Sequence, residues 1–165
     1  MPEKETLERA RQDQREGKSA STQAGEFVRE EMHHIREGKH GARSPQQAIA
    51  IGLSKARRAG VKLPPPARGK TSEKTRKSAQ LAYVKGQKGA TSKTSPTRSR
   101  ATRSALKREG HAAASTSALA RQAKRAARRR SPAQRSAAAR KAARTKTPAQ
   151  RSAAARKAAR TRIGK

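Results

Sequence analysis

The chain has no cysteine and no tryptophan, and Phe27 and Tyr83 are its only aromatic residues. The absence of cysteine excludes disulfides, thiolate metal sites and cysteine nucleophiles. Alanine, which buries little area, makes up most of the 31% of residues that are hydrophobic. Such side chains cannot offset the entropy lost on ordering all 165 residues. We therefore expect a mostly α-helical protein with one small ordered module and extensive disorder elsewhere.

Long apolar runs and catalytic motifs are missing as well. No apolar stretch reaches the roughly 18 residues of a membrane span, and the N-terminal segment MPEKETLERARQD has no signal-peptide core. Residues 86–95, GQKGATSKTS, lack the Gly-Lys-Ser/Thr ending of a phosphate-binding loop. No serine, histidine and aspartate lie in a context that would assemble a triad. We expect a cytoplasmic protein that is not an enzyme and uses no cofactor.

Acidic residues are absent after Glu109, and the net charge of +32 is concentrated in the second part of the chain. Residues 1–66 hold 13 Lys/Arg and 9 Asp/Glu, whereas residues 67–165 hold 30 Lys/Arg and 2 acidic residues. A segment of this kind repels itself until a polyanion neutralises it. On charge alone, the neutralising partner could be DNA, RNA, an anionic membrane or an acidic protein.

Helix start and stop signals organise the N-terminal part. Residues 3–16 are good helix formers, but their few apolar side chains predict an exposed or frayed helix. A second helix is predicted from a cap at Ser21 or Thr22 to Glu37, before Gly38. A third is predicted from the Ser44-Pro45 start to Ala59. Val61 and Leu63 are expected to fold back over this pair.

These signals predict four regions. They are an N-terminal charged helix (1–20), a helical-hairpin module (21–66), a basic flexible linker (67–98) and a basic Ala/Arg repeat tail (99–165). The linker includes a possible short helix at 73–85. The module is small enough that a homodimer or a protein partner, contacted through residues 22–63, could complete its core. A helix-turn-helix reader is the alternative, although the seven-residue connection is long for that motif.

Residues 47–66, QAIAIGLSKARRAGVKLPPP, resemble an uncharacterised bacterial family of unknown function marked by QAIAI, then LS, ARRAG and a closing proline. The upstream segment STQAGEFVREEMHHIREGKHGARS is similar to longer members of that family. Some members are labelled plasmid-stabilisation or DNA-binding proteins. The resemblance covers about residues 1–66 and implies a bacterial source; it brings no established chemistry.

The tail has a period of 16 residues. SPAQRSAAARKAARTK (131–146) is followed by TPAQRSAAARKAARTR (147–162), and weaker copies start at residues 115 and 99. Ser131 and Thr147 are predicted caps before a proline, so each good copy is predicted to be a short helix. On a helical projection Arg140, Lys141 and Arg144 span an arc of about 100°, with alanines opposite.

The basic side chains of these copies are the predicted phosphate contacts. Their arcs carry no Asn, Gln or Thr, so we expect backbone binding of low sequence specificity. The tail is similar in composition to linker-histone and bacterial histone-like tails, which implies a nucleoid- or plasmid-associated DNA-binding protein. The predicted nucleic-acid-binding residues are Arg121, Lys124, Arg125, Arg128, Arg129, Arg130, Arg135, Arg140, Lys141, Arg144, Lys146, Arg151, Arg156, Lys157, Arg160 and Arg162.

Two alternatives remain for the tail. An RNA- or ribosome-associated protein is the first, although single-stranded RNA favours aromatic stacking platforms that the tail lacks. The second is a protein-interaction module with a solubilising basic tail. Membrane binding is not expected, because alanine inserts poorly into an interface.

The histidines do not predict a metal site. Glu30, His33, His34 and Glu37 have helical spacing, but no pair of histidines flanks a glutamate as in metalloproteases. An exposed, solvated helix face explains them. His40 and His111 are interpreted as isolated loop residues by the same argument.

Overall fold

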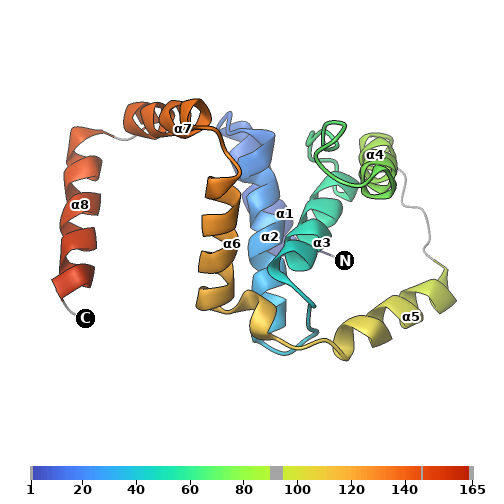
Figure 1. Ribbon diagram of the computed structural model, residues 1–165. Coiled ribbons are helices and arrows are strands. Elements are labelled where there is room, and N and C mark those ends of the chain that lie inside the picture. The colour runs from blue at the N-terminus through green and yellow to red at the C-terminus, as the bar shows by residue number, and fades with distance from the viewer. Residues whose placement is uncertain (1, 90–94, 146, 164–165) are drawn as a thin grey trace. The chain divides into compact units, whose positions relative to one another are not determined.

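The computed structural model describes residues 2–89, 95–145 and 147–163 (Figure 1). Within those residues it contains eight α-helices, one short 3-10 helix and no strand. The elements are α1 (Lys4–Arg15), α2 (Ala20–Arg36), α3 (Pro45–Arg58), α4 (Glu73–Gln87), α5 (Pro96–Lys107), η1 (Ala112–Ala114), α6 (Thr116–Arg128), α7 (Pro132–Thr145) and α8 (Pro148–Ile163).

The prediction of a mostly α-helical chain with tandem short helices is therefore confirmed, and the prediction of extensive disorder is wrong. Helices occupy much of the linker and the tail, where few side chains are large and apolar. Low hydrophobicity limits how much core a segment can bury, but it does not lower helix propensity. Alanine has the highest intrinsic propensity and arginine and lysine follow closely, so local preference favours helix in these segments.

By its contacts, the chain divides into two units, residues 1–122 and residues 123–165, with α6 continuous across the division. In the first unit α2 packs against α1 and α3, and α3 packs against α4. In Figure 1, α1 lies behind α2 and is largely hidden by it. The predicted hairpin of the second and third helices is thus present, with a helix on each side.

Local signals place the ends of α2 and α3. Ser44 caps α3 by accepting a hydrogen bond from the Gln47 amide at 3.2 Å, with Pro45 in the first turn as predicted. The cap of α2 is Ser19, which accepts from the Thr22 amide at 3.3 Å, so this helix begins slightly before the predicted position. Gly38 and Gly60 follow the two helices with positive φ, the conformation that a glycine accepts without strain.

The core of the first unit consists of two small clusters. Ala10, Ala24, Phe27, Ala56 and Val61 form one, with Leu63 packed against it. The expected return of Val61 and Leu63 over the helix pair is confirmed. The other cluster joins Met32 and Ile35 of α2 to alanines of α3, the loop before it and η1.

Close contact between backbones partly replaces large side chains in this core. A Cβ atom on Gly52 of α3 would lie 2.8 Å from the Cα of Val28 in α2. The two helices can approach this closely only because position 52 has no side chain. Each alanine along the contact then buries its full, small area, which suits a chain poor in large apolar residues.

The predicted exposure of the first helix is wrong. Thr6, Ala10 and Asp13 are buried on α1, and Leu7 packs on the cluster around Phe27. Arg9 forms an ion pair with Glu26 of α2 at 2.9 Å. The buried side of α1 is largely polar, so a search for an apolar stripe could not find it.

The packed unit also includes a segment from the predicted tail. Backbone amides of Gly41 and Ala42 donate to the carbonyls of Leu106 and Gly110 at 2.9 and 3.1 Å. A Cβ on Gly41 would collide with the carbonyl of Glu109, so this docking requires glycine. The segment then continues into η1, whose Ala113 and Ala114 are buried in the second cluster.

Candidate nucleic-acid interface

The last three helices follow the 16-residue period. α6, α7 and α8 begin at Thr116, Pro132 and Pro148, directly after the repeat positions Ser115, Ser131 and Thr147. The weak copy at residue 99 does not continue the phase, because α5 already begins at Pro96. Three in-phase helices therefore form the array.

α7 and α8 each begin with a complete capping box. The Ser131 hydroxyl accepts from the Gln134 amide at 3.2 Å, and the Gln134 side chain accepts from the Ser131 amide at 3.1 Å. Thr147 and Gln150 repeat this exchange at 3.3 and 3.0 Å. The S/T-P-A-Q spacing encodes this reciprocal pair, a signal that the sequence analysis missed by considering only the hydroxyl cap.

α7 and α8 bury none of their described side chains, and the Arg151 guanidinium group of α8 donates to the Ala143 carbonyl of α7 at 3.1 Å. All residues from 123 to 145 and from 147 to 161 are exposed. A helix of about 14 residues without a buried side is marginal in water, so its stability depends mainly on alanine propensity and on its caps. Like charges three and four positions apart oppose it.

The basic arcs therefore face solvent. The predicted binding residues from Arg121 to Arg130, Arg135 to Arg144 and Arg151 to Arg160 are all exposed. Lys146 and the side chain of Arg162 lie outside the described residues. Among the described residues, no ion pair involves a side chain beyond Arg76, so intramolecular carboxylates do not neutralise these arcs.

α6 differs from α7 and α8 because its start is anchored. Ala118 is buried and Leu119 packs against the cluster that contains Met32 and Ile35. Arg121, Lys124, Arg125 and Arg128 share an arc of about 100° on the helical projection, as in α7. Its two ends thus have different roles: the first turn is fixed to the core, and the basic arc follows on the exposed side.

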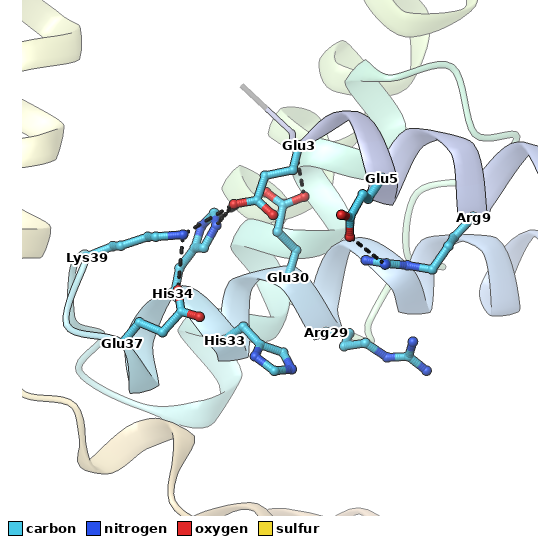
Figure 2. Close-up of a pocket in the computed structure, with 9 residues that line it drawn as sticks. All are labelled: Glu3, Glu5, Arg9, Arg29, Glu30, His33, His34, Glu37 and Lys39. Atoms are coloured by element: carbon cyan, nitrogen blue, oxygen red, sulfur yellow. Dashed lines mark hydrogen bonds and ion pairs between the residues drawn. The ribbon is translucent and has the colours of Figure 1, made fainter.

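A second charged feature lies on the first unit. α1, α2 and the loop after α2 enclose a pocket of about 300 Å³ (Figure 2). Glu3 accepts hydrogen bonds there from His34 at 2.8 Å and Lys39 at 3.3 Å, which lower the pKa of its carboxyl group. Glu5 pairs with Arg9 at 3.2 Å on the same wall. Because its groups of both signs pair with one another and apolar walls are few, it does not resemble a small-molecule site.

Part of the chain matches a known protein family. Residues 15–67 match a family of unknown function, DUF6496. No curated protein and no solved structure matches the chain. The matched segment contains α2 and α3, so the predicted resemblance to an uncharacterised family is confirmed for this part. None of the described helices combines the length and the apolar character that crossing a membrane requires.

Proposed function

We propose that this protein is a non-enzymatic, histone-like DNA-binding protein that contacts the phosphates of duplex DNA through the basic arcs of α6, α7 and α8. The observation that carries the proposal is the repeated arc itself. Three in-phase helices each present three or four clustered cations to solvent, and no acidic side chain accompanies them. A tail that only increased solubility would need the positive charge but not the regular 16-residue spacing of the helices.

Helix geometry favours a duplex partner. An α-helix with its side chains is about 10–12 Å across, and the major groove of B-DNA is about 12 Å wide. A basic arc of about 100° on such a helix can reach phosphates along a groove. The major groove of duplex RNA is too narrow and deep for side chains to enter in this way. Duplex DNA is therefore the preferred partner and RNA is the rival.

The chemistry of the arcs supports contact with the backbone. Arginine and lysine pair with phosphates of any sequence, and the alanines beside them offer no hydrogen bonds to base edges. We expect low specificity, strong dependence on salt and a nucleoid- or plasmid-associated location. The first unit, which contains the family match, would supply an interaction with a protein partner or a second copy.

Binding is also expected to stabilise the helices. Phosphates placed along an arc would cancel the repulsion between neighbouring cations that opposes α7 and α8. Circular dichroism of the full chain should therefore gain helical signal when duplex DNA is added, with no such gain from an uncharged polymer.

The sharpest test compares two variants that lose the same charge. In one, the arcs of α7 and α8 are neutralised with glutamine, which keeps helix propensity: Arg140, Lys141, Arg144, Arg156, Lys157 and Arg160. In the control, six exposed cations of α4 and α5 are changed in the same way: Lys74, Lys77, Lys85, Arg98, Arg100 and Arg103.

Affinity for a labelled duplex is measured across a series of salt concentrations. Each phosphate contact contributes about −0.9 to the slope of log K against log[salt], so the arc variant should flatten the slope by up to about 5. The control variant should change it much less. Equal losses in both variants, or an affinity independent of salt, would refute the proposal. Competition between duplex DNA and structured RNA at one salt concentration distinguishes the two partners.

A further inference from the structure

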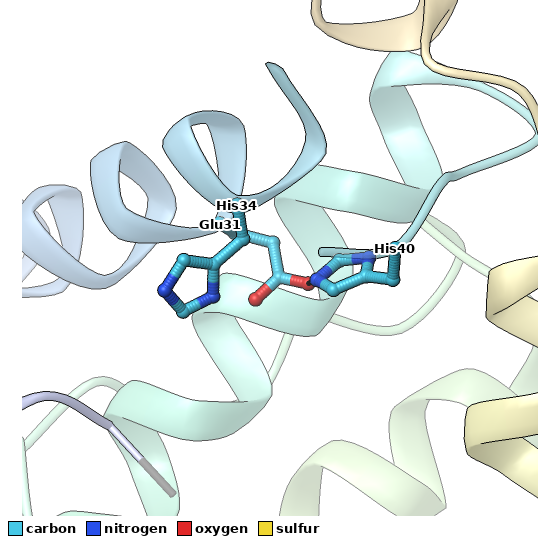
Figure 3. Close-up of side chains that lie close together, drawn as sticks. All are labelled: Glu31, His34 and His40. Atoms are coloured by element: carbon cyan, nitrogen blue, oxygen red, sulfur yellow. Dashed lines mark ion pairs between the residues drawn. The ribbon is translucent and has the colours of Figure 1, made fainter. Parts of the chain in front are cut away.

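Glu31, His34 and His40 come together in the first unit, although sequence analysis treated His40 as an isolated loop residue (Figure 3). Each offers a potential ligand atom, and these atoms lie within 4.8 Å of one another. The Nε2 atom of His40 is 3.0 Å from Oε1 of Glu31. The Glu31 side chain is only 1% exposed, and the two histidines are 12% and 15% exposed.

The loop after α2 brings His40 back beside that helix. The chain reverses at Gly38, and the backbone amides of Gly41 and Ala42 then attach the loop to residues 106–110. Glu31 and His34 are one helical turn apart on α2. The three side chains are therefore supported by α2 and by a loop whose backbone is hydrogen-bonded to residues 106–110.

The outer nitrogen of each histidine already has an acceptor. Nδ1 of His40 lies 3.0 Å from the carbonyl of Gly41, which can only accept, so this nitrogen carries the hydrogen. Nε2 of His34 lies 2.8 Å from a carboxylate oxygen of Glu3, which accepts, so this nitrogen donates. In their neutral forms both rings turn an unprotonated nitrogen toward Glu31 (Figure 3).

That arrangement is typical of metal-binding histidines. A ligating imidazole usually donates its other N–H to a carboxylate or a backbone carbonyl, which fixes the tautomer and the ring orientation. Here His34 has a carboxylate partner in Glu3, and His40 has a backbone carbonyl partner in Gly41. Oε2 of Glu31 forms an ion pair with the Lys55 ammonium group at 2.7 Å, and Oε1 faces His40. Two ring nitrogens and a buried carboxylate thus converge, with Lys55 as the competing cation.

We propose that Glu31, His34 and His40 bind a divalent transition-metal ion of the zinc class. Two imidazoles and one carboxylate suit zinc, which takes such ligands at about 2.0–2.2 Å in a tetrahedral arrangement. Tetrahedral ligand atoms at those distances lie about 3.3–3.6 Å apart. The 3.0 Å separation between His40 and Glu31 would therefore open slightly, and wider separations in the cluster would shorten by up to about 1.5 Å. A water molecule completes the set, and Lys55 retains a carboxylate partner in Glu30, 3.3 Å away.

The ion would link α2 to the loop that receives residues 106–110. It would therefore stabilise the first unit and act independently of the proposed DNA contacts, which lie on α6, α7 and α8. The site would also account for the approach of the loop residue His40 to the buried carboxylate of Glu31. A rival arrangement has a protonated His40 forming a plain ion pair with Glu31.

The test uses the full, metal-free chain. Cobalt(II) replaces zinc as a visible probe, because tetrahedral cobalt absorbs far more strongly than octahedral cobalt, and zinc affinity is measured by calorimetry. The ligand variants are Glu31→Gln, His34→Gln and His40→Gln. The matched controls are His33→Gln, an exposed residue of the same helix, and His111→Gln. Glu3→Gln tests the outer hydrogen bond, with a loss of about tenfold in affinity expected.

One tetrahedral cobalt ion per chain is expected, displaced by zinc, lost in the ligand variants and retained in both controls. An octahedral spectrum, or binding that persists in His40→Gln or disappears in His33→Gln, would overturn the proposal. Should a ligand variant fail to fold, histidine ring NMR of the unchanged protein decides. Zinc must shift the signals of His34 and His40 and leave those of His33 and His111 in place, and any other pattern rejects the site.

Discussion

The stability of the tail helices should respond with opposite signs to the same substitution at two positions of one repeat. Ser131 caps α7 through its hydroxyl group, whereas Ser136 lies within the helix and is exposed. Replacing a capping serine by alanine costs about 1 kcal/mol. Replacing an exposed serine inside a helix by alanine gains about half as much, because alanine has the higher helix propensity.

The absence of packing makes these small energies visible. α7 has no buried residue, so no packed core holds the helix when its cap is lost. A change of about 1 kcal/mol alters the ratio of helix to coil about fivefold at room temperature. In a packed helix such as α3 the same change would lower the stability of the whole unit slightly and leave the helix population nearly unchanged.

Carbonyl and Cα chemical shifts of residues 132–145 measure the helix population directly. Ser131→Ala should lower it, Ser136→Ala should raise it, and far-UV circular dichroism should follow in the same directions. Saturating duplex DNA should restore most of the helix in Ser131→Ala, with weaker affinity than that of the unchanged chain. Equal responses at the two positions would show that the capping box does not operate in solution.

Three further predictions concern the first unit. Phe27→Ala should destabilise it by about 3–5 kcal/mol in urea unfolding, because Phe27 is fully buried in a small core. Gly41→Ala should cost about 1–3 kcal/mol and increase amide exchange at residues 106–110, since a Cβ there would displace the docked backbone. Hydrogen bonds, first from Lys18 and then from Gln12, lower the pKa of Glu16, so the stabilisation exists above its ordinary value of 4.5 and is lost as the pH falls through the lowered pKa. Lys18→Gln should therefore lower the melting temperature more at about pH 6 than at about pH 3; an equal loss at both would contradict this assignment.

Sequence reasoning succeeded where local chemistry decides. Ser44-Pro45 and Gly38 mark helix ends through hydrogen bonds and backbone conformations that involve neighbouring residues only. The period of 16 placed the starts of α6, α7 and α8 for the same reason. It missed the complete capping box, although the S/T-P-A-Q spacing was present in the sequence.

It failed where partners are distant in the chain and carry no apolar signature. The buried side of α1 contains Thr6 and Asp13, which resemble surface residues in the sequence. The docking of residues 106–110 uses backbone amides and carbonyls, which every residue has. The prediction of disorder was wrong for another reason. Low hydrophobicity with high net charge indicates that a segment cannot form a core, and the tail helices need no core.

The sequence alone determined the helical content, the 16-residue phase and the separation of charge, because helix propensity, caps and net charge are properties of short segments. Tertiary structure decided which polar residues of α1 are buried and how far the packed unit extends along the chain. It also decided that His40 lies beside Glu31 and His34. The burial on α1 depends on its packing against α2. The other two outcomes depend on a loop reversal and on backbone hydrogen bonds across more than 60 residues of chain, which no local pattern encodes.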